Sequence, residues 1–168
     1  MVNIIKKIRH NLKQILNWQL HVFKFKDKPL PVYSNYSPNG IKLHIGAGEI
    51  NLQGWINIDA RKYDHTHLLS NEIKLSEFND GTVQEIYLCH VLEHFSFCET
   101  NQLIDLFFKK LKKGGILRLA VPSFDSLIEV YKKNNNDIEK VKYALMGGQD
   151  YEYNFHKSVY NFNEIKKI

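Results

Sequence analysis

Strand-like and helix-like segments alternate along the middle of the chain, and this alternation constrains the fold more than any other feature. Four short apolar runs have the pattern of buried strands: residues 41–48, 54–60, 83–91 and 115–123. Two stretches carry apolar residues at helical spacing: residues 99–115 and 123–134. Such alternation predicts a parallel sheet covered on both faces, so we expect an α/β fold with a doubly wound, mostly parallel sheet.

Basic residues are concentrated at the N-terminus. Residues 1–28 hold seven of the 23 Lys and Arg residues but only one of the 18 acidic residues. Within this arm, residues 3–22 place apolar side chains at helical spacing, which predicts an amphipathic helix. The helix suits peripheral contact with an anionic membrane surface, or packing on the domain or on a partner. Residues 29–40 contain three of the four prolines and predict a linker to a domain at 41–168.

Length and composition narrow the class of protein. A chain of 168 residues suits one domain with a substantial core. It contains no apolar run of 18 residues, so we expect no transmembrane helix. The two cysteines, Cys89 and Cys98, suit a reduced cytoplasmic protein better than a disulfide scaffold. Because the charge is confined to the arm, without a basic and aromatic stripe, we expect no nucleic-acid binding.

The segment "LCHVLEHF", residues 88–95, contains the spacing His90, Glu93 and His94 that marks one class of zinc peptidases. In those enzymes a helix presents the residues to the metal. Here the string follows an apolar strand, and the next helix is expected only around Glu99. The two histidines therefore need not share a helical face. No later His or Glu completes a recognisable ligand set, so we expect no metal and interpret the segment as the lip of a ligand pocket.

Glycine and polar residues follow three of the predicted strands. Gly46, Ala47 and Gly48 end the first, Asp59 ends the second, and His90 ends the third. In a parallel sheet these strand ends share one edge, where ligands of doubly wound folds bind. The glycines allow close approach of the backbone, and a carboxylate can accept both hydroxyls of a ribose. The position of a third fingerprint glycine holds Asn51, and no crossover helix fits before the next strand. An adenosine ligand without phosphates is therefore favoured over a dinucleotide.

Three ordered segments then resemble a known family: residues 42–60, 83–95 and 111–131. They are similar to the class I S-adenosylmethionine-dependent methyltransferases, especially a small bacterial branch often associated with cell-surface polysaccharide genes. The resemblance, over about residues 41–165, implies a Rossmann-like methyltransferase fold, S-adenosylmethionine as cofactor, and a small-molecule or saccharide acceptor. It implies that Gly46, Ala47 and Gly48 pass under the methionine part of the cofactor and that Asp59 holds the ribose. It further implies that Asn71 faces the adenine, while His90, Leu92 and Glu93 line the methyl-donor side.

The acceptor side is expected in residues 146–162. His156 is the candidate general base, because a hydroxyl or amine acceptor loses a proton when it is methylated. The tyrosines of this segment would form walls for a sugar or aromatic acceptor: Tyr151, Tyr153 and Tyr160. The alternative is that His156 caps a helix or packs structurally.

The family resemblance also leads us to expect a shortened C-terminus. Members have seven strands, the last two forming a hairpin, whereas this sequence ends at Ile168, in the expected helix before that hairpin. Residues 115–121 would then form an exposed edge strand, which is a template for association and an oligomer. The alternative function is a non-catalytic or truncated relative that acts as a binding or assembly module.

Overall fold

The computed structural model describes residue 37 and residues 40–168, which belong to the second of the chain's two units, Pro31–Ile168. The predicted helix at 3–22 and almost all of the predicted linker at 29–40 lie outside the described residues. Within the described part, none of the helices combines the length and the apolar character that crossing a membrane requires.

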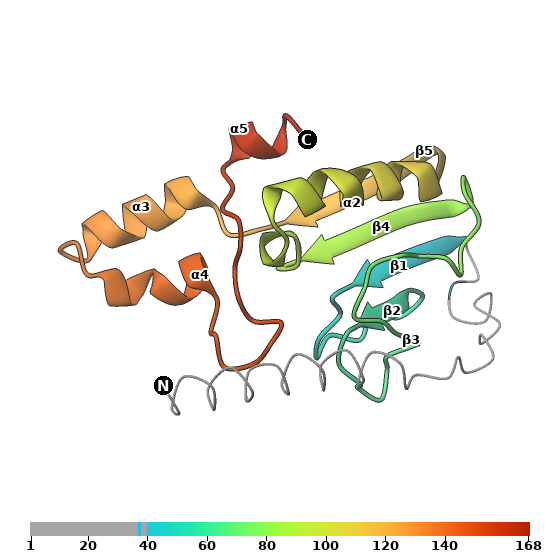
Figure 1. Cartoon of the computed structure of the whole chain (residues 1–168), viewed down its shortest axis with the longest axis horizontal. Helices are drawn as coiled ribbons and strands as arrows, with labels where there is room; N and C mark the ends of the chain where they lie inside the picture. The colour runs from blue at the N-terminus through green and yellow to red at the C-terminus, as the bar shows by residue number, and fades with distance from the viewer. Residues whose placement is uncertain (1–36, 38–39) are drawn as a thin grey trace, which may run out of the picture. The chain divides into compact units, whose positions relative to one another are not determined.

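Parallel strands form the centre of the described part (Figure 1). They are β1 (Ile41–Ile45), β2 (Ile56–Asp59), β3 (Leu68–Leu69), β4 (Val83–Cys89) and β5 (Leu111–Ala120). Every neighbouring pair is parallel, and the order across the sheet is β3-β2-β1-β4-β5. This order reverses direction between β1 and β4, as in doubly wound sheets that bind ligands at the reversal. The predicted α/β, Rossmann-like fold is therefore confirmed.

The helical elements follow β4 and β5 in the chain. They are η2 (Leu92–His94), α2 (Phe97–Lys110), α3 (Phe124–Lys133), η3 (Ile138–Lys140), α4 (Lys142–Met146) and α5 (Phe162–Ile165). Ser96 begins α2 with a capping box, in which the Ser96 side chain accepts from Glu99 N and the Glu99 side chain accepts from Ser96 N. Ser123 caps α3, since its hydroxyl accepts from Ser126 N.

The predicted helix over 99–115 is wrong at its C-terminal end. α2 ends at Lys110, and Leu111 already has an extended backbone that pairs with Val83 of β4. The register with β4 shifts after this pair and resumes at Ile116, so residues 112–115 form a bulge. Gly114, with φ of +75°, supplies the left-handed conformation that the bulge requires. Strand pairing therefore overrides the helix propensity of the lysines.

The two faces of the sheet differ in chemistry. One face is apolar and packs against Leu103 and Phe107 of α2. Complete burial of side chains of this size contributes about 1.5–3 kcal/mol each. The residues that alternate with these apolar side chains along each strand point to the opposite face of the sheet. They are mostly polar: Lys42, His44, Asn57, Glu85, Tyr87 and Arg118. The sequence alternation I-K-L-H-I of β1 explains this difference, because successive side chains of a strand point to opposite faces of the sheet.

On the polar face, Glu85 is buried between two cations. Its carboxylate lies 3.8 Å from Lys42 Nζ and accepts a hydrogen bond from Arg118 Nε. This pairing compensates for the burial of its charge. Neither α3 nor α4 buries a residue, and the two lie side by side beyond the carboxyl ends of the strands (Figure 1). In the described part, α2 is therefore the helix that covers the sheet.

β5 is the outermost strand of the described sheet, with β4 as its neighbour on one side. This is the position expected for residues 115–121. Association of copies through this edge stays a prediction.

Candidate functional site

The loop after β1 is joined to the end of β2. Gly46 N and Ala47 N both donate to Ile58 O, at 2.9 and 3.1 Å. Gly48 N donates to Asp59 Oδ2 at 2.7 Å, and Arg61 N donates to Asp59 Oδ1 at 2.7 Å. Asp59 is 8% exposed, and each carboxylate oxygen keeps a further lone pair for another donor. The structure thus brings Gly46, Ala47, Gly48 and Asp59 together as predicted from the sequence.

The two glycines of this loop have different surroundings. Both lie in the left-handed region, with φ of +69° at Gly46 and +53° at Gly48. A Cβ on Gly46 would lie 2.1 Å from Val91 Cγ2, so Gly46 is required for packing against the segment after β4. A Cβ on Gly48 would meet no atom within 4 Å. Gly48 therefore faces open space, where a ligand can approach the backbone.

His90 follows β4 in a strained conformation. Its φ of +56° is uncommon for a residue with a side chain and costs about 1 kcal/mol or more. Its backbone N donates to Ala120 O at 2.9 Å, which fixes the turn to the end of β5. The side chain is 65% exposed, and its Nδ1 lies 3.1 Å from Glu93 Oε1. Leu92, in contrast, is fully buried, so its side chain contributes to the packing and not to a pocket wall.

Glu93 is a buried carboxylate, only 1% exposed, on the short helix η2. Its Oε1 faces His90 and lies 3.9 Å from His156 Nε2. Its Oε2 has no hydrogen-bond partner among the described residues. A buried carboxylate with an unpaired oxygen is costly, so Glu93 marks a place where a further group is needed.

His94 and His156 lie beside Glu93. Their rings are 4.9 Å apart in an edge-to-face arrangement. His94 Nδ1 donates to Phe155 O at 3.2 Å, and His156 Nδ1 donates to Ala144 O at 3.1 Å. Because each neutral ring then carries its proton on Nδ1, each Nε2 keeps a lone pair. Burial lowers the pKa of His156, against the opposing effect of the Glu93 carboxylate.

His156 also holds the end of α4. Its backbone N donates to Met146 O at 3.0 Å, and its ring donates to Ala144 O. The alternative interpretation, that His156 caps a helix, therefore fits the role of its Nδ1, which donates to a carbonyl of α4. Its Nε2 has the lone pair that a general base needs, but the side chain is only 9% exposed.

The segment after His156 runs back toward the sheet and binds the backbone of Glu93. Lys157 N and Ser158 N both donate to Glu93 O, at 2.7 and 3.2 Å. Tyr160 hydrogen-bonds Thr100 of α2 at 2.8 Å and is buried, so it is not an exposed wall of an acceptor site. A cavity of about 10 Å³, enough for one water molecule, is lined by Glu93, His156 and Ser158.

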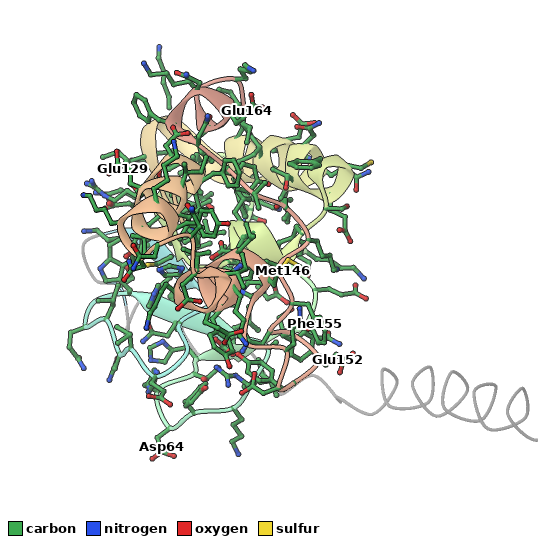
Figure 2. All side chains as sticks on the ribbon, turned by 90° about the vertical axis from the view of Figure 1, so that its left-hand side faces the viewer. Asp64, Glu129, Met146, Glu152, Phe155 and Glu164 are labelled. Carbon is green, nitrogen blue, oxygen red and sulfur yellow. The ribbon has the colours of Figure 1, made fainter. Side chains whose placement is uncertain are left out.

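The other predicted tyrosines lie over the β2 and β3 side. Arg61 lies over the Tyr151 ring, with 4.5 Å between the guanidinium carbon and the ring centre. Burial and the Glu152 carboxylate raise the pKa of Tyr153, and a hydrogen bond with Asn71 opposes them. Asn71 therefore lies beside Tyr153. Figure 2, viewed from the side of α3 and α4, shows Met146, Phe155 and Glu152 following one another along one side of the molecule.

His94 and Ser158 belong to this site, although we did not predict a chemical role for either. The signal for His94 was present in the string His-x-x-Glu-His. The partners of that string lie far along the chain, since His94 and Phe155 are 61 residues apart. No local pattern indicates such a pairing.

The likeness of this chain to known proteins is distant. No protein-family model matches the chain, and no curated protein matches it. The chain is similar to the crystal structure of a SAM-dependent methyltransferase from Archaeoglobus fulgidus, with 18% sequence identity and a TM-score of 0.49. The match covers 80% of this chain and 61% of that protein, so the chain spans less than two thirds of that protein's length.

Proposed function

We propose that this chain binds S-adenosylmethionine and transfers its methyl group to a small-molecule or saccharide acceptor. One observation carries the proposal: the loop Gly46–Gly48 is hydrogen-bonded to Asp59 beside the reversal of strand order between β1 and β4. Ligands of open α/β sheets bind at such a reversal. The resemblance of the three sequence segments to class I methyltransferases supports the same cofactor.

The residues at this edge fit the cofactor. Asp59 keeps lone pairs that can accept the ribose hydroxyls while it holds the backbone of Gly48 and Arg61. The open space at Gly48 allows close approach of the ligand. His90, held in its strained turn, presents an exposed ring from the end of β4. When bound, S-adenosylmethionine supplies a methyl group already activated on a sulfonium, so the protein needs no nucleophile and mainly positions the two reactants.

The acceptor hydroxyl or amine gives up one proton as its oxygen or nitrogen forms the new bond to the methyl carbon, while the bond from that carbon to the sulfonium breaks and leaves a neutral thioether. We assign that proton to His156 Nε2, which has the lone pair for it. Glu93, with Oε1 3.9 Å away, would stabilise the imidazolium. A role in cell-surface polysaccharide synthesis would suit a saccharide acceptor.

The burial of the His156 side chain favours a second candidate. A proton acceptor with so little exposure has little access to an acceptor molecule. A binding or assembly module that holds the cofactor without turnover would need no such access.

Isothermal titration with S-adenosylmethionine tests the proposal. Asp59→Asn removes the charge from the carboxylate that would bind the ribose, and Asp64→Asn is the matched control at an exposed acid in the same connection. Hydrogen bonds to a charged group contribute about 1.5–3 kcal/mol, so D59N should weaken binding by about 10-fold or more, and D64N should not. The absence of both heat and thermal shift at millimolar ligand would refute the cofactor. Binding without transfer of a labelled methyl group to any cell-surface sugar would favour the module.

A further inference from the structure

We propose that Glu93, His94 and His156 form a binding site for a divalent transition metal, and that Zn²⁺ is the ion that this ligand set suits best. Each residue offers one ligand atom, and these atoms all lie within 4.8 Å of one another. Two imidazoles and one carboxylate form a common ligand set of catalytic zinc. Hard ions such as Mg²⁺ prefer a site built from oxygens.

The hydrogen bonds of the two histidines orient them as metal ligands. Metal-binding histidines almost always donate the other ring N–H to a carbonyl or carboxylate, which fixes the ring and its tautomer. His94 does so to Phe155 O, and His156 does so to Ala144 O. The lone pairs of both Nε2 atoms are thus fixed before any ligand arrives.

The buried carboxylate is the second, independent observation. Glu93 is 1% exposed, yet Oε2 has no hydrogen-bond partner among the described residues. Burial removes the Glu93 carboxylate from water, and a divalent cation beside the carboxylate would compensate for its charge. His90, whose Nδ1 lies 3.1 Å from Oε1, would hold the carboxylate in orientation.

The spacing is close to that of a tetrahedral site. With bonds of about 2.1 Å, ligand atoms around tetrahedral zinc lie about 3.4 Å apart. Glu93 Oε1 and His156 Nε2 are separated by 3.9 Å, and all three ligand atoms lie within 4.8 Å of one another, so side-chain rotations would have to bring them closer by up to about 1.4 Å. One water in the adjoining cavity could satisfy Glu93 Oε2 and Ser158 Oγ, whereas a metal ion would also engage the Nε2 lone pairs of the partly buried His94 and His156.

Three protein ligands leave one coordination position, which a water molecule in the adjoining cavity would fill. A water molecule bound to zinc loses its proton to solvent far more readily than a free one, and the resulting hydroxide could take the proton of an acceptor. Since one lone pair cannot hold a metal and a proton together, the metal would replace His156 as the activating group. This role for the ion, but not the site itself, rests on the proposed methyl transfer.

Zn²⁺ titration of the full chain, after chelation and dialysis, tests the site. We expect one ion per chain by elemental analysis, with micromolar or tighter binding by calorimetry. Glu93→Gln and His156→Asn each remove a ligand with little change in size, and each should weaken binding by at least 10-fold. The control H10A/H21A removes the two histidines of residues 1–28 and should leave this binding unchanged.

A thermal shift provides a second readout. Zn²⁺ at about 100 times its Kd should raise the Tm of the wild type by about 5–10 °C, but not that of folded E93Q. Absence of stoichiometric Zn²⁺, or binding lost in H10A/H21A and retained in both E93Q and H156N, would overturn the site. If the chain binds S-adenosylmethionine but no Zn²⁺, the metal site is overturned and the proposed cofactor stands. Zn²⁺ binding without S-adenosylmethionine binding would uphold the site and overturn the methyl transfer.

Discussion

Replacing Gly46 with alanine should destabilise the fold by about 2–5 kcal/mol. A non-glycine residue in the left-handed region costs about 1–2 kcal/mol, and Gly46 has φ of +69°. The new Cβ would also lie 2.1 Å from Val91 Cγ2, in a buried contact that must give way. Val91 is β-branched and stiff at χ1, so we add about 1–3 kcal/mol for overpacking. Domains are stable by about 5–15 kcal/mol, so this is a large fraction of the total.

Gly48→Ala provides the matched control. It also lies in the left-handed region, with φ of +53°, but its Cβ would meet no atom within 4 Å. G48A should therefore cost only the conformational 1–2 kcal/mol or so. Urea denaturation at 25 °C measures both differences. Thermal unfolding should show a decrease in Tm of about 4–20 °C for G46A, at 2–4 °C per kcal/mol.

The double variant G46A/V91A isolates the contact. If the Cβ introduced by G46A and the Val91 side chain collide, V91A should recover part of the loss, with a coupling of about 0.5–3 kcal/mol. Equal destabilisation by G46A and G48A would refute the packing argument. So would strictly additive effects of G46A and V91A.

Two further predictions concern the cap of α2 and the buried histidines. Ser96→Ala should lower the free energy of unfolding by about 1 kcal/mol through loss of the capping box, with an unchanged m-value in urea, and an unaltered midpoint would contradict it. Stability should also fall as the pH drops from 7 to 5. Burial lowers the pKa of His44, His67 and His156, so the unfolded chain takes up protons near pH 6.5 before the folded chain does. In urea titrations between pH 7 and pH 5, the free energy of unfolding of H44Q should fall less steeply with pH than that of the wild type. Equal pH dependence of the two proteins would contradict the role of His44.

Local patterns predicted the parts of the fold that local forces decide. The strand ends at Gly46 and Asp59 were predictable because apolar runs stop there and parallel strands share one carboxyl edge. The cap at Ser123 was predictable because capping depends on residues within one turn. β3, at Leu68–Leu69, is too short to leave a periodic signal and was not predicted.

Other features depend on partners that are distant in the sequence. Lys112 and Lys113 favour a helix, but the pairing of Leu111 with Val83 takes the chain into the sheet before them. The Glu93 cluster is the clearest case in the candidate site. Its string of His and Glu was visible, but His156 reaches it only because residues 157 and 158 bind the Glu93 carbonyl. Spacing alone cannot indicate this contact.

The attachment of His156 to α4 couples the position of its imidazole to the opening of the helix end. α4 has only five residues, too few for a helix that is stable by itself, and two of its carbonyls accept hydrogen bonds from His156. At about 1 kcal/mol each, these bonds would limit the open state to a few per cent. When the last turn of α4 opens, the ring loses the carbonyl that holds it, so opening of the helix end should release the ring. Amide hydrogen exchange at His156 would therefore report the position of its imidazole, and a ligand that fixes the ring should slow that exchange.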